Sequence, residues 1–92
     1  MKALLYPGSG SENPIEVEPK KGGTFELREL QDLVNGMIEV ISLNHGEIMI
    51  VNEEGSLFGL PVNQQATALF NAKVGPGKIV GPALICKSEM VP

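Results

Sequence analysis

The chain has 92 residues, of which 42% are hydrophobic and 20% charged, a composition typical of one globular domain spanning residues 1–92. Aromatic residues make up 4% of the chain, so we expect a core of Leu, Ile, Val and Met. Seven Lys and Arg residues against eleven Asp and Glu give a net charge of −4. A protein that neutralises phosphates carries the opposite sign, so we expect no nucleic acid as a partner.

Cysteine content and hydropathy indicate the cellular location of the protein. Cys86 is the single cysteine, so an internal disulfide is excluded, and the apolar run at the start is shorter than the ~7–15 residues of a signal-peptide core. A membrane-spanning helix needs ~20 apolar residues, and even residues 37–51 are interrupted by polar and charged side chains. We therefore expect a cytoplasmic protein with no membrane partner.

The first elements form a hairpin. Residues 2–6 and 15–18 are strand candidates, and residues 7–14 between them have the Gly, Ser and Pro content of a loop. Residues 3–5 are apolar at successive positions, so both faces of this strand are apolar. The first strand is therefore expected inside the sheet.

A helix follows the hairpin. Apolar residues recur at three- and four-residue spacing, as on an amphipathic helix: Leu27, Leu30, Val34 and Met37. Thr24 is the expected N-cap, and Asn35-Gly36 is the expected end, because these residues accept the left-handed conformation that closes a helix.

Two further strands are expected at residues 37–43 and 47–52, joined by the turn-forming Asn44-His45-Gly46. Residues 48–51 are apolar on both faces, which favours the middle of a sheet or a sheet with both faces covered. The chain then turns at residues 52–55.

Asn63 is the expected cap of a second helix that runs to about residue 72, with Ala66, Leu69 and Phe70 facing inward. A last strand over residues 78–87 contains Gly81-Pro82. Proline offers no donor to a ladder, so this strand is expected at an edge or at a bulge. The predicted order is β-β-α-β-β-α-β.

Short segments spread over nearly the whole chain share a family resemblance: Met1-Lys2-Ala3-Leu4-Leu5, Ile38-Glu39-Val40, Val51-Asn52-Glu53-Glu54-Gly55, Gly59-Leu60-Pro61, Asn63, Ala66-Thr67 and Ile79-Val80-Gly81. Together they resemble the family catalogued as domain of unknown function 3846. The resemblance implies a small protein of phages, plasmids or bacterial genomes with mobile elements, and it implies no activity. The chain departs from the family pattern at Pro82, where an acidic residue is common, and in a longer Gly-Ser loop at residues 8–11.

Three polar residues are candidates for binding a ligand. Asn63 and Thr67 lie four residues apart, on one face of the second helix, and Asn52 precedes the turn that leads to it. They could form a small polar pocket. The alternative is local structure: Asn63 caps the helix, Thr67 bonds a helical carbonyl, and Asn52 closes the turn.

Catalytic and metal-binding patterns are weak. Glu53-Glu54 lacks the further oxygen ligands that a hard cation needs, and His45 in its turn has no second histidine or nucleophile at a telling spacing. Gly77-Lys78 lacks the flanking residues of a phosphate loop, and Cys86 is expected to be a small buried hydrophobe. We expect no enzyme activity, no metal and no cofactor.

The expected fold is an α+β domain: a mainly antiparallel five-stranded sheet with two helices on one face. Two such helices would leave one apolar face of the sheet uncovered. A homodimer would cover it; the alternative is that the sheet curls around itself or that the loop at residues 55–62 folds across it. The leading functional hypothesis is a non-enzymatic accessory or regulatory module of a phage or mobile element that binds a protein partner. The alternative is a domain that binds a small ligand, such as a nucleotide, through Asn52, Asn63 and Thr67.

Overall fold

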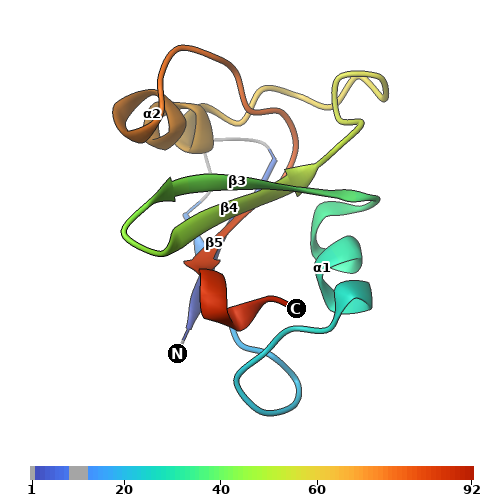
Figure 1. The fold of residues 1–92 in the computed structure, drawn as a ribbon. Coiled ribbons are helices and arrows are strands. Elements are labelled where there is room, and N and C mark those ends of the chain that lie inside the picture. Colours follow the sequence, from blue (N-terminus) through green and yellow to red (C-terminus); the bar gives the residue numbers. More distant parts are fainter. Residues whose placement is uncertain (1, 9–12) are drawn as a thin grey trace.

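The computed structural model describes residues 2–8 and 13–92, so most of the predicted Gly-Ser loop lies outside the described residues. The elements follow the predicted order and end in a short 3-10 turn: β1 (Ala3–Tyr6), β2 (Ile15–Val17), α1 (Leu27–Val34), β3 (Ile38–Asn44), β4 (Glu47–Asn52), α2 (Gln64–Lys73), β5 (Ala83–Lys87) and Ser88–Met90. The fold is the predicted α+β class (Figure 1).

The five strands form one antiparallel sheet in the order β2-β1-β5-β4-β3. β1 and β4 are internal, as their two apolar faces predicted. The prediction that the last strand lies at an edge or a bulge is wrong, because β5 is the central strand. β5 begins at Ala83, so Pro82 precedes the ladder, and the N–H that proline lacks is not needed there.

The hairpin of β3 and β4 confirms the predicted turn. His45 and Gly46 have φ values of 50° and 76°, and two successive positive φ values are what a tight type I′ turn requires. The register pairs Glu39 with Val51 and Val40 with Ile50. Glu39 and Val40 therefore lie on opposite faces of the sheet.

The start of α1 differs from the prediction. Its N-cap is Glu26, not Thr24, and Glu26 N–H donates to Glu29 Oε1 at 2.9 Å. This hydrogen bond is the main cause that lowers the pKa of the Glu29 carboxyl. Phe25 is buried and its N–H donates to Met90 O at 2.7 Å, which holds the chain extended past Thr24, so the helix begins later.

The end of α1 agrees with the prediction. Asn35 caps it in the left-handed conformation, with φ 63°. Met37, which the spacing placed on the helical face, lies beyond this cap and leads into β3. The helix therefore buries Leu30 and Val34.

The helices lie on opposite faces of the sheet, which corrects the prediction that both cover one face (Figure 1). Two apolar clusters alternate along β4 and β5. The α1 side holds Leu30, Val34, Ile48, Ile50, Leu84 and Cys86. The α2 side holds Ala66, Leu69, Phe70, Met49, Val51, Ala83 and Ile85. Strands that are apolar on both faces need a cover on each, and the two helices supply one each.

This arrangement changes the argument for a dimer. The expectation of a homodimer rested on an apolar sheet face that the chain itself leaves uncovered. α2 covers that face, with Ala66 fully buried against it. A face-to-face dimer is therefore not needed to bury the sheet.

Candidate functional site

Asn63 is fully buried at the start of α2. Its Oδ1 accepts from Ala66 N–H at 3.1 Å, the predicted N-cap bond. Its Nδ2 donates to the carbonyl oxygens of Tyr6, Pro7 and Gly81 at 3.0, 3.1 and 2.9 Å. Asn63 thus fastens α2 to the end of β1 and to the chain before β5, and both ends of its amide are used within the protein.

Thr67 lies one helical turn after Asn63, and both residues hold the backbone of Ile79. Thr67 Oγ1 accepts from Ile79 N–H at 2.9 Å and donates to Ile79 O at 3.3 Å. Asn63 N–H also donates to Ile79 O, at 2.7 Å. The spacing correctly placed Asn63 and Thr67 on one face, but these two hydrogen bonds of the Thr67 hydroxyl go to the backbone of Ile79, before β5, and not to a carbonyl of its own helix.

Asn52 lies at the end of β4 and is almost completely buried. Its Oδ1 accepts from Glu54 N–H at 2.8 Å, which closes the predicted turn. Its Nδ2 donates to the carbonyl oxygens of Val34 and Asn35 at 3.1 and 3.2 Å, so it also satisfies the end of α1. These contacts give Asn52, like Asn63 and Thr67, a structural role.

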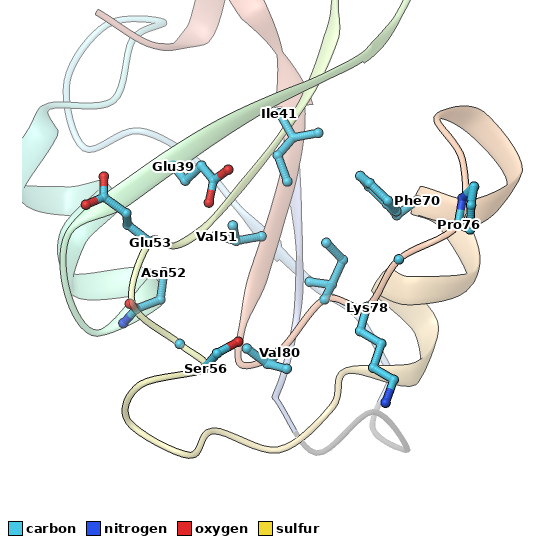
Figure 2. A pocket seen from close by; sticks show the side chains of 13 residues that line it. Glu39, Ile41, Val51, Asn52, Glu53, Ser56, Phe70, Pro76, Lys78 and Val80 are labelled. Atoms are coloured by element: carbon cyan, nitrogen blue, oxygen red, sulfur yellow. The ribbon is translucent and has the colours of Figure 1, made fainter.

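A cleft of about 410 Å³ opens on the α2 side of the sheet, between β3 and the segment that follows α2 (Figure 2). Its lining is mixed: polar side chains and backbone groups lie beside the apolar side chains of Ile41, Val51, Phe70, Ile79 and Val80. Of the three residues predicted to bind a ligand, Asn52 lines this cleft. No pattern in the sequence predicted the cleft, because its walls come from segments far apart in the chain.

The rim of the cleft is charged. Glu39 and Glu53 lie on its β3 side, Ser56 at one end, and Lys78 on the opposite wall (Figure 2). Figure 2 shows the Glu39 carboxylate turned toward the open space, whereas the Lys78 side chain extends away from it. Within residues 2–8 and 13–92, Glu39 takes part in none of the ion pairs. The β3 side of the cleft therefore presents an exposed negative charge.

A loop at residues 53–60 runs beside the cleft. Its backbone is hydrogen-bonded internally, with Phe58 N–H to Glu54 O at 3.1 Å and Leu60 N–H to Gly55 O at 3.1 Å. Gly55 is packed so closely on Val80 that an added Cβ would lie 2.7 Å from Val80 Cγ2. At the tip of this anchored loop, Leu57 and Phe58 are 79% and 64% exposed.

His45 and Cys86, the weaker candidates for a functional role, do not line the cleft. His45 occupies the exposed hairpin turn, as predicted. Cys86 is buried in the sheet, where desolvation and then the Glu47 carboxylate raise the pKa of its thiol to about 11. Among the residues that the structure describes, no three His, Cys, Asp or Glu side chains gather as a metal site would require.

The described helices are all too short or too polar to cross a membrane. No curated protein and no solved structure matches the chain significantly. A family model matches residues 1–90. This match includes β1, the residues that line the cleft and the loop at residues 53–60. The chain belongs to the family described as Domain of unknown function (DUF3846).

Proposed function

We propose that the protein is a non-enzymatic accessory or regulatory module of a phage or mobile element, and that it binds a protein partner through the tip of the loop at residues 53–60. The observation that carries this proposal is the exposure of Leu57 and Phe58, 79% and 64%, on a loop with internal hydrogen bonds. The phage or mobile-element setting is supported by the family resemblance.

Two adjacent large apolar side chains in water are costly for a protein that gains nothing from them. Burying a Leu or Phe side chain is worth roughly 1.5–3 kcal/mol, so Leu57 and Phe58 offer a compact source of binding energy. The hydrogen bonds of the loop hold the tip in place before any partner arrives. Ordering the loop on binding therefore costs little entropy, and apolar anchors of this kind dominate protein interfaces.

The non-enzymatic part of the proposal is supported by the scatter of the reactive groups. Catalysis by a nucleophile or by acid and base requires such groups within hydrogen-bond reach of one another. Cys86 is buried in the core, whereas His45 lies in an exposed turn. Glu39 faces the cleft without a described ion-pair partner.

A pull-down from the native host, read by mass spectrometry, tests the proposal. The baits are the natural protein and a double variant with Leu57→Ser and Phe58→Ser. Val74→Ser, which removes another half-exposed apolar side chain at the end of α2, is the matched control. We expect a partner that the natural protein and the control recover and the double variant loses. Equal recovery by all three baits contradicts the proposal.

A second copy of the chain is the other candidate partner. The dimer no longer follows from an uncovered sheet face, but the loop tip offers a surface for it. Light scattering at micromolar concentration distinguishes the cases: a mass that stays near 9.8 kDa means that the partner is a different protein. A mass near twice that value, lost with Leu57→Ser and Phe58→Ser, assigns the tip to self-association.

The alternative function, binding of a small ligand such as a nucleotide, is favoured by the cleft. Its volume of about 410 Å³ falls in the range of roughly 300–1,000 Å³ typical of ligand pockets. The Glu39 carboxylate disfavours phosphate and favours a ligand with a positive group. Thermal melting with ATP and with an arylalkylamine tests both ligand classes, and a higher Tm with either supports this function.

A further inference from the structure

The cleft opens beside the free edge of the sheet. β3 is the last strand in the order β2-β1-β5-β4-β3, and with seven residues it is the longest of the described strands. An edge strand of this length leaves a row of backbone N–H and C=O groups without a partner strand. Figure 1 shows β3 running along the outside of the sheet, with α2 on one face and α1 on the other.

The register shows which backbone groups point outward. Glu53 N–H donates to Met37 O at 2.8 Å, so the pair just before β3 is hydrogen-bonded. Hydrogen-bonded and non-bonded pairs alternate along an antiparallel ladder. The backbone groups of Ile38, Val40 and Ser42 therefore point away from β4, toward the open edge.

At two neighbouring positions, Glu39 and Val40, the two faces of this edge differ in chemistry. On the α2 side, Glu39 directs its carboxylate into the cleft. On the α1 side, Val40 is 51% exposed, and it lies on the same face as Ile50 and the α1 cluster. A strand added to β3 would place successive side chains on these two faces in turn.

We propose that β3 accepts an extended segment of a partner protein as an additional antiparallel strand, and that this segment has a basic residue next to an apolar one. A Lys or Arg of the segment lies beside Glu39 at the mouth of the cleft, and an apolar side chain covers Val40. This inference deepens the proposed function and rests on it for the class of partner. The open edge supplies the binding mode, and charge complementarity selects the segment.

Antiparallel addition suits the position of Glu39. The backbone groups of Val40 point outward, so Val40 would form a hydrogen-bonded pair with the added strand. Glu39 would then form a non-bonded pair with that strand, and cross-strand side chains come closest in such pairs. A second copy of the chain fits this edge less well. Two copies, each with a net charge of −4, would bring their Glu39 carboxylates to the same short interface.

Fluorescence anisotropy with synthetic peptides tests the proposal. The probe is a labelled peptide as long as β3, seven residues, in which lysine and valine alternate. In antiparallel addition the valine N–H groups face β3 and the lysine N–H groups face solvent. We expect N-methylation of the valine amides to abolish binding, N-methylation of the lysine amides to leave it within about twofold, and glutamate in place of lysine to abolish it.

Protein variants check the register. Glu39→Lys should weaken binding of the lysine-valine peptide by about tenfold at ~0.15 M salt. Glu16→Lys is the control, because it makes the same change of charge on β2, at the opposite edge of the sheet. It also removes the exposed ion pair with Lys2, and it should change affinity less than about twofold. Neither residue is buried, so both variants should fold.

Several outcomes would overturn the inference: no binding of the lysine-valine peptide, equal effects of the two N-methylated peptides, or equal effects of Glu39→Lys and Glu16→Lys. A dimer that the peptide dissociates would also overturn it, by assigning the edge to a second copy. The proposed function is tested separately, because Leu57→Ser and Phe58→Ser leave β3 intact. Loss of the host partner with those changes and no peptide binding would refute this inference alone.

Discussion

Replacing Asn63 by alanine removes more than a helix cap. The cap bond to Ala66 N–H accounts for about 1 kcal/mol. The change also strips the Nδ2 donor from the carbonyls of Tyr6, Pro7 and Gly81. A buried carbonyl left without a donor costs about 1–3 kcal/mol, and the bond to Gly81 O is the buried one of the three.

The sum is a loss of about 3 kcal/mol in the free energy of unfolding, if water reaches the other two carbonyls. In a chain of 92 residues, each kcal/mol shifts Tm by roughly 4–8 °C, so Tm should fall by about 12–24 °C. Urea denaturation should show a lower midpoint with an unchanged m value. Asn71→Ala, at an exposed position of the same helix, should change stability by less than about 0.5 kcal/mol.

A second substitution separates the two roles of the amide. Asn63→Asp keeps an oxygen that can cap Ala66 N–H but sets another oxygen against carbonyl groups. It should therefore destabilise at least as much as Asn63→Ala. A loss of only about 1 kcal/mol in Asn63→Ala, the value of a cap alone, would refute the role of Nδ2, as would a near-neutral Asn63→Asp.

Further predictions concern Asn52, Cys86 and metal ions. Asn52→Ala should cost about 2 kcal/mol in urea denaturation, because it leaves the carbonyls of Val34 and Asn35 without their donor; an unchanged midpoint would contradict this. The thiol of Cys86 has a pKa of about 11 in the folded protein against an ordinary 9.0, so the unfolded chain ionises first and stability should fall as pH rises from about 9 to about 11. The difference in urea midpoint between the natural protein and Cys86→Ala isolates this effect, and a constant difference would disprove it. EDTA and added divalent cations should leave Tm unchanged; a metal-induced rise of several degrees would show a site that we do not expect.

The local elements followed from the sequence because their signals are local. The alternation in residues 15–18, the turn at Asn44-His45-Gly46 and the cap at Asn63 each act within a few residues. Apolar residues on both faces of β1 and β4 correctly placed these strands inside the sheet. The same pattern also indicated that both faces of the sheet must be covered by other elements. It did not indicate that α1 would cover one face and α2 the other.

The start of α1 and the place of β5 depended on distant contacts. Thr24 has the chemistry of an N-cap, but the bond from Phe25 N–H to Met90 O delays the helix. Pro82 predicted an edge strand. β5 instead lies between β1 and β4, because it begins at Ala83, the residue after the proline. Local propensity was outweighed in both cases by packing against the other end of the chain.

The sequence by itself determined which polar residues matter in this protein, and the tertiary structure decided what they do. Asn52, Asn63 and Thr67 stand out in the sequence because packing alone does not explain them. Their partners lie up to 57 residues away in the chain, so no local pattern could distinguish a ligand site from a set of structural bonds. The cleft, the exposed loop tip and the free edge of β3 likewise arise only when the strands are ordered. Sequence spacing encodes contacts over a few residues, whereas sheet order and helix placement depend on burying both faces of the sheet at once.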